Sequence, residues 1–184
     1  MHLPSKKKCY RLMVEMKMMD HIVAHSLQVC RVATLIVDRL TGLAVPPDCR
    51  LVVVASLLHD ITKTRSFETG ENHASTGGKL LVDLGYPQVG EVIRQHVRLD
   101  TYTVLGTVVE AEIVNYADKR VLHDKVVSLD ERMAYVCKRY GNTIDAREQL
   151  KWLQDKTVTL EQKLFRYLPF SPEDLLKQLN SRTP

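Results

Sequence analysis

The chain has 184 residues, of which 45% are hydrophobic and 26% charged, and its formal net charge is +4 at pH 7. This length and composition predict one globular domain with its own core, and do not favour a disordered chain. A mild charge without a basic stripe fits a small anionic substrate and does not favour nucleic acid. With no signal peptide and no apolar run of about 18 residues, we expect a soluble cytoplasmic protein outside the membrane.

The spacing of apolar residues predicts helices along most of the chain. Apolar residues recur at every third or fourth position over 20–40, whereas the segment 48–60 is apolar nearly all round, which is typical of a buried central helix. The segment 61–72 is polar and is expected to be irregular. The predicted helices cover residues 20–40, 48–60, 73–84, 87–97, 109–123, 129–140, 146–157 and 160–167, with a short last helix after Ser171.

No segment shows the alternation of period two that is typical of strands, so the predicted fold class is all-α. We expect a single-domain helical bundle over residues 20–141. Residues 1–19 are expected to be an N-terminal extension, and the only run of like charges, Lys6 to Lys8, is expected to be a solvated start. Residues 142–184 are expected to form a C-terminal helical extension packed on the core.

Two histidines and two aspartates fall on the core-facing sides of three predicted helices. His25 lies on the apolar stripe of the first, His59 and Asp60 end the buried second, and Asp118 lies beside inward apolar positions of a later one. A lone histidine of this kind is usually a core residue, but an unpaired buried carboxylate is strongly disfavoured. A divalent cation at their meeting point explains all four residues together, as in other helical bundles.

Two more histidines flank the polar region that follows Asp60. His73 begins one predicted helix and His96 lies near the end of the next. Each alone is typical of an exposed or capping residue, but together they would reach a second cation that shares Asp60. His123 and Asp124 repeat the same two letters in a polar context, where a surface pair is the simpler interpretation.

These residues resemble the HD superfamily of metal-dependent phosphohydrolases, an all-α bundle with an H…HD…D metal signature. The resemblance rests on HSLQVCRVA, LLHDITK and NYADKRV, and it extends over about 20–141. It implies that His25, His59, Asp60 and Asp118 bind a first metal. His73 and His96 are similar to the added histidines of two-metal branches of the family.

The chain departs from the family pattern at Thr62, where the related HDIGK motif has glycine, and this departure would alter the turn of the loop. Only one histidine stands at positions 96 and 97, where the cyclic-dinucleotide branch has two. Lys63, one turn after Asp60, is placed to neutralise charge on a phosphoryl group, although a solvated loop residue is an equal alternative. Weaker candidates for phosphate contacts are Arg98, Lys119 and Arg120.

The resulting hypothesis is a hydrolase that cleaves a phosphoester or pyrophosphate bond of a nucleotide or dinucleotide with a metal-activated hydroxide. One or two ions would act as Lewis acids and lower the pKa of a bound water towards about 7. Mixed nitrogen and oxygen ligands favour Mn, Fe, Co, Ni or Zn. Two alternatives remain open, a metal-stabilised regulatory or interaction module without turnover and an RNA phosphodiesterase. The oligomeric state is not indicated.

Overall fold

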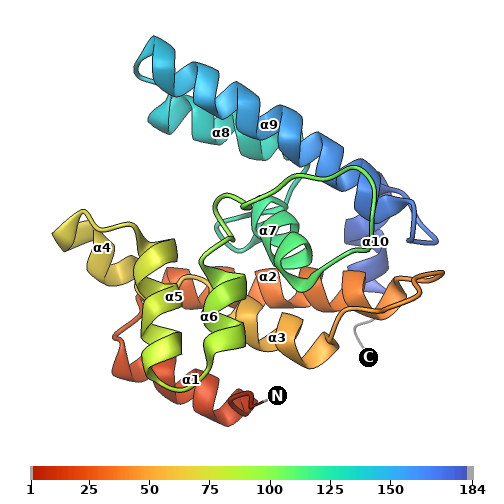
Figure 1. Cartoon of the computed structure of the whole chain (residues 1–184). Helices are drawn as coiled ribbons and strands as arrows, with labels where there is room; N and C mark the ends of the chain where they lie inside the picture. Colours follow the sequence, from red (N-terminus) through yellow and green to blue (C-terminus); the bar gives the residue numbers. More distant parts are fainter. Residues whose placement is uncertain (1, 182–184) are drawn as a thin grey trace.

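The computed structural model describes residues 2–181, and its helices pack around a central pair, α2 and α3 (Figure 1). Within these residues only one very small antiparallel sheet accompanies the helices, and the predicted all-α fold class is confirmed. The elements are α1 (Lys6–Glu15), α2 (Asp20–Arg39), α3 (Cys49–Leu58), α4 (Lys63–Thr69), α5 (His73–Asp83), α6 (Pro87–Ile93), α7 (Glu110–Lys119), β1 (Val121–Leu122), β2 (Lys125–Val126), α8 (Leu129–Tyr140), α9 (Ile144–Phe165), a 3-10 turn (Pro172–Asp174) and α10 (Leu175–Asn180).

Helix α3 forms the centre of the core. The Asp48 carboxylate caps its first turn by accepting hydrogen bonds from the backbone amides of Arg50 and Leu51. Every residue from 51 to 58 is buried, as its uninterrupted apolar sequence predicts. Helices α2, α6 and α7 pack around it. The end of α3 is therefore held deep inside the bundle, and the two residues that follow it are buried as well.

Helices α5 and α6 approach each other at two glycines. A Cβ atom on Gly90 would lie 2.5 Å from the carbonyl oxygen of Gly78, and one on Gly78 would lie 3.0 Å from the carbonyl oxygen of Gly90. The two backbones are therefore in direct contact, which only residues without a side chain permit. Because His73 begins α5 and His96 follows α6, this contact also sets the distance between the two histidines.

The C-terminal helices are anchored to the bundle at one end. Figure 1 shows α8 and α9 as an antiparallel pair that extends away from the other helices. At its inner end α9 contributes Leu160 and Leu164 to the core, and the Lys163 ammonium pairs with the buried Glu112 carboxylate of α7 at 2.7 Å. The residue range predicted for this extension is not tested by these contacts, and its residues 182–184 lie outside the described part of the chain.

Three local predictions were wrong. The helices predicted over 146–157 and 160–167 are one helix, α9, which ends at Phe165, because the interval between them holds no glycine or proline to break it. Residues 63–69, expected to be irregular, form α4, which Gly70 ends with a left-handed φ of 69°. The helix predicted over 109–123 stops at Lys119, and a short hairpin follows it.

The N-terminal segment contains a helix that the sequence pattern did not predict. It forms α1, in which Ser5 caps the first turn and Cys9, Leu12 and Met13 are buried. The lysine run in the first turn of α1 hides this apolar stripe when the segment is read by its charge alone. Helix α1 packs on α3, so this segment covers part of the core.

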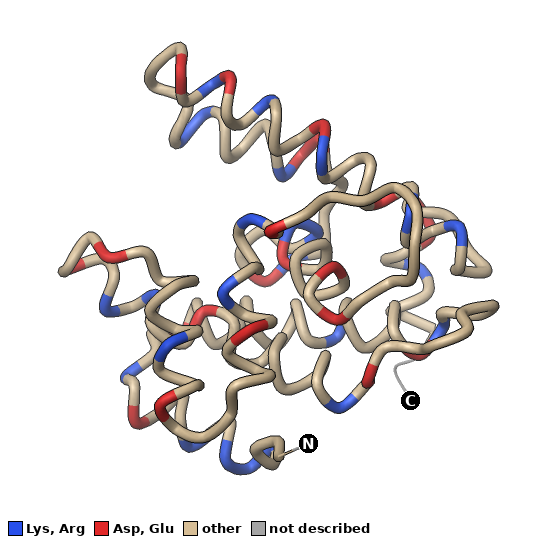
Figure 2. Tube along the Cα trace, viewed as in Figure 1, with Lys and Arg blue, Asp and Glu red and all other residues tan. Residues whose placement is uncertain are grey.

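Two surface properties bear on the partners expected from the sequence. None of the described helices is both long and apolar enough to cross a membrane. Along the hairpin of α8 and α9, positions of Lys and Arg are interspersed with positions of Asp and Glu (Figure 2). In this view the positive charge is not gathered into one continuous stripe.

We predict that Gly90→Ala lowers the free energy of unfolding by about 2 kcal/mol, because the added methyl group overlaps backbone atoms of α5. This loss exceeds the gain in helix propensity, which is about 1 kcal/mol. Urea unfolding followed by circular dichroism measures the change. The exposed Gln88 of the same helix is the matched control, and Gln88→Ala should change the stability by less than about 0.5 kcal/mol. Equal stability of the two variants would contradict the close contact.

Candidate metal centre

Three helices bring the predicted ligands of the first cation together. His25 lies on the buried face of α2, His59 and Asp60 follow the last turn of α3, and Asp118 lies in the last turn of α7. All four are buried, and His59 and Asp60 are completely so. His25 Nε2 lies 3.0 Å from Asp118 Oδ1, and His59 Nε2 lies 3.6 Å from the same oxygen.

Asp60 contacts two different groups of histidines through its two oxygens. Its Oδ2 lies 3.4 Å from His59 Nε2 and 4.0 Å from His25 Nε2. Its Oδ1 lies 3.3 Å from His73 Nε2 and 3.4 Å from His96 Nε2. These last two nitrogens are 3.1 Å apart. The carboxylate therefore stands between the two histidine groups.

Two sets of ligand atoms in the centre are close enough to hold a metal ion. One set consists of His25, His59 and Asp118, and the other of His59, Asp60 and His96. In each set the candidate atoms lie within 4.8 Å of one another. The structure thus contains histidine and aspartate clusters of the mixed nitrogen and oxygen type that suits divalent transition metals.

Backbone carbonyl groups orient three of the histidines. The Nδ1 atoms of His25, His59 and His96 donate to the carbonyl oxygens of His123, Ser56 and Ile93, at 2.8, 2.8 and 2.6 Å. Because a carbonyl oxygen only accepts, Nδ1 carries a proton, and Nε2 is the ring nitrogen that faces the centre. This arrangement of the outer nitrogen is typical of metal-binding histidines.

The electrostatics of the centre favour a positive charge between the side chains. Burial alone would lower the pKa of His59, but Asp60 and Asp118 outweigh this effect and raise it to about 10. Burial alone would raise the pKa values of Asp60 and Asp118, yet neighbouring histidines hold both well below the ordinary value. Both carboxylates are therefore ionised at neutral pH, as metal ligands must be.

Two buried atoms of the centre lack a hydrogen-bond partner within the described residues, namely His59 Nε2 and Asp60 Oδ1. Burial of an unpartnered polar atom costs about 1–3 kcal/mol, and a bound ligand that contacts the atom would remove this cost. Both point into the sets of candidate metal ligands described above. The residues present therefore fit a divalent cation.

Lys63 enters the centre from the first residue of α4. Its ammonium group pairs with Asp60 Oδ2 at 2.7 Å. Burial alone would lower the pKa of Lys63, but Asp60 raises it, so the side chain stays charged. The structure thus places this cation beside the candidate ligands rather than in solvent.

Thr62 suits its position although related motifs have glycine there. Its φ of −107° lies in the range of ordinary residues, so no glycine is required. The side chain is buried, and its hydroxyl donates to the carbonyl oxygen of His73 at 2.8 Å. Thr62 therefore ties the turn after Asp60 to the start of α5.

The structure does not bring Lys119 or Arg120 to the centre. Both are buried, and Lys119 Nζ donates to the carbonyl oxygens of His96 and Asn115. Arg120 donates to the carbonyl oxygens of Val127 and Pro172, and it pairs with Glu161. The donors of these two side chains are used to connect parts of the fold.

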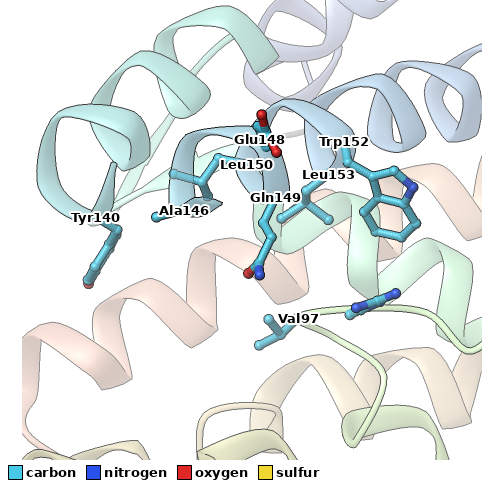
Figure 3. Close-up of a pocket in the computed structure, with 9 residues that line it drawn as sticks. Val97, Tyr140, Ala146, Glu148, Gln149, Leu150, Trp152 and Leu153 are labelled. Atoms are coloured by element: carbon cyan, nitrogen blue, oxygen red, sulfur yellow. The ribbon is translucent and has the colours of Figure 1, made fainter. Parts of the chain in front are cut away.

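Arg98 lies in a separate and larger cavity of about 590 Å³, between the loop after α6 and the α8–α9 hairpin (Figure 3). Its guanidinium carbon lies 4.5 Å from the ring centre of Trp152, a cation–π contact. None of the predicted metal ligands lines this cavity. Size alone would therefore select the wrong cavity as the site of the chemistry.

Two features of the centre were missed by sequence reasoning. The carbonyl of His123 orients His25, and no side-chain pattern reveals a backbone acceptor. The cavity beside the centre is also lined by Arg132, Tyr135 and Arg139 of α8. These residues are three and four positions apart on a predicted helix, and this spacing could have indicated that they lie on the same face.

Comparisons with known proteins agree with this geometry. A family model described as HD domain matches residues 22–121. The tRNA (cytidine(56)-2'-O)-methyltransferase of Picrophilus torridus is 24% identical over 145 residues, which are 72% of this chain and 40% of that protein. The aligned region is thus less than half the length of this relative.

A solved structure is similar over most of the chain. The predicted HD superfamily hydrolase from an uncultured Thermotogales bacterium superposes with a TM-score of 0.51, covering 90% of this chain and 94% of that one. The two sequences are 22% identical. At this identity the likeness concerns the fold.

We predict that the metal-loaded chain holds two Mn²⁺ ions, that Asp60→Asn loses both, and that His96→Ala loses one. The two oxygens of Asp60 face both histidine groups, whereas His96 belongs to only one of these groups. Metal content after dialysis, measured by inductively coupled plasma mass spectrometry, checks this. His123→Asn is the matched control, because His123 contacts His25 through its backbone and asparagine tolerates its positive φ. Full metal content in Asp60→Asn would contradict the shared centre.

Proposed function

Because this chain belongs to the HD-domain family, we propose that its buried centre is that of a metal-dependent phosphohydrolase. Family membership supports a metal-dependent hydrolase. The finer proposal is that the enzyme cleaves a phosphoester or pyrophosphate bond of a nucleotide or dinucleotide. His25, His59, Asp60 and Asp118 are the proposed ligands of one ion. His73 and His96 are the proposed additional ligands of a second.

The observation that carries this proposal is the position of Asp60 between two groups of histidines. Its two oxygens face different groups, each at 3.3–4.0 Å. A single structural ion needs only one such group. Two adjacent cation sites that share a carboxylate are typical of enzymes that displace groups at phosphorus. The arrangement therefore favours catalysis over a purely structural role.

A divalent cation held by these residues supplies Lewis acidity and lowers the pKa of a water molecule towards about 7. The chain's own residues bind and orient the substrate. Lys63 lies 2.7 Å from Asp60 and carries a positive charge, so it is proposed to neutralise a phosphoryl oxygen at the centre. The complete burial of His59 and Asp60 keeps bulk water away from this part of the site and strengthens these charge interactions.

A second candidate function is hydrolysis of an RNA phosphodiester. It is favoured by one observation, that a relative aligned over 145 residues is named as a tRNA methyltransferase. That name describes a different reaction of a longer protein. RNA substrates therefore belong in any screen, and release of a nucleotide from RNA but not from free nucleotides would favour this second candidate.

In the presence of Mn²⁺ or Co²⁺ we predict hydrolysis of nucleotides with release of phosphate, or of dinucleoside polyphosphates to two nucleotides. For Asp60→Asn we expect kcat/KM to fall by more than about a hundredfold. Malachite-green detection of phosphate and chromatography of the products measure it. Lys79→Ala, an exposed change on α5, is the control and should keep full activity. A chain that binds metal and hydrolyses none of these substrates would favour a regulatory module instead.

A further inference from the structure

A cavity of about 260 Å³ connects the metal centre to the surface. It is lined by the buried His25 and Asp60, by the half-buried Lys63 and Arg132, and by the exposed Arg139. This gradient of burial shows that the cavity runs from the core outwards. A substrate whose reacting group lies at His25 and Asp60 would therefore extend along Arg132 and Arg139.

The two arginines lie on one face of α8. Arg132, Tyr135, Val136 and Arg139 recur at intervals of three and four residues, and all four line the cavity. A capping box between Ser128 and Glu131 fixes the start of the helix. The position of this face is therefore set by the fold and does not depend on a flexible loop.

The cavity has more positive than negative groups. Asp60 is the only carboxylate in its lining, and this group already contacts the histidines and Lys63. Within the described residues no carboxylate pairs with Arg132 or Arg139. The positive charges of Arg132 and Lys63 repel each other across the cavity. Arg139 Nε donates to the Tyr140 hydroxyl at 3.3 Å, and Tyr135 is a further uncharged partner of its guanidinium group. Like charges gathered in a cleft attract an anion.

We propose that Arg132 and Arg139 bind a second phosphate group of the substrate, so that the substrate class is a compound with a diphosphate group. This inference rests on the proposed function, because it places the reacting phosphate at the metal centre. Lys63 then binds the reacting phosphate group, and the two arginines bind the second phosphate group next to it. Guanidinium groups suit this role, since their planar donors bond two phosphate oxygens at once.

The position of α8 in the chain separates this role from that of the metal ligands. The family model matches residues 22–121, and α8 covers Leu129–Tyr140. All six proposed ligands therefore lie within the matched segment, whereas both arginines lie after it. Selection of a diphosphate would then depend on α8, which lies after the segment that the family model matches.

Binding to the metal-loaded full-length chain tests the proposal without requiring turnover. Isothermal titration calorimetry with methylenediphosphonate and with inorganic phosphate compares the two anions. We expect Arg132→Ala and Arg139→Ala each to weaken diphosphonate binding about tenfold and phosphate binding by less than about threefold. Arg132→Lys should fall between, because lysine keeps the charge but loses the planar donors.

Lys138→Ala is the matched control, because it removes the same charge from an exposed position of α8 outside the cavity lining. It should leave both affinities unchanged. The proposal would be overturned if the arginine variants weakened the binding of both anions equally. It would also be overturned if Lys138→Ala weakened diphosphonate binding as much as they do. The exposed Arg139 keeps the test valid even if Arg132→Ala unfolds the chain. Hydrolysis of nucleotides by variants with unchanged diphosphonate affinity would reject this inference alone, and arginine-dependent binding without any hydrolysis would reject the proposed function alone.

Discussion

The buried carboxylate of Asp60 is the constraint on which the centre depends. A charged group at the end of a fully buried helix is strongly disfavoured unless cations compensate it. The surrounding side chains supply Lys63 and a raised pKa at His59, and still leave Asp60 Oδ1 without a hydrogen bond within the described residues. On the proposed function, a divalent ion bound here would partner this oxygen, stabilise the core and form the reactive site.

Several features of the fold act on this one position. The contact between Gly78 and Gly90 brings α5 and α6 together, and with them the two histidines that face Asp60 Oδ1. Thr62 ties the turn after Asp60 to the carbonyl of His73. These contacts come from residues without metal-binding groups, but they determine whether six distant side chains meet. Precise placement of the ligands is thus a property of backbone packing.

The sequence predicted which side chains meet at the centre better than it predicted the local structure. His25, His59, Asp60 and Asp118 were found because an inward polar residue on an apolar stripe needs a partner, and the structure brings these four together. Lys119 and Arg120 were chosen by their position beside Asp118. Their direction depends instead on partners that pattern reasoning does not place, because Lys119 donates to the His96 carbonyl and Arg120 pairs with Glu161 of α9. The merging of two predicted helices into α9 escaped prediction for a related reason, since a short polar interval without glycine or proline does not require a break.

The same C-terminal contacts connect metal binding to the cavity. Helix α7 carries Asp118, and it also carries Glu112, which is paired with Lys163 of α9 at 2.7 Å. Helix α9 packs in turn on α8, which presents Arg132 to the cavity. A buried ion pair of this kind holds its partners in one geometry, because either charge is costly when left alone. Helices α7 and α9 therefore fix the distance between the metal centre and the arginines of α8. A fixed distance is required if the site is to distinguish substrates by the length of their phosphate chain.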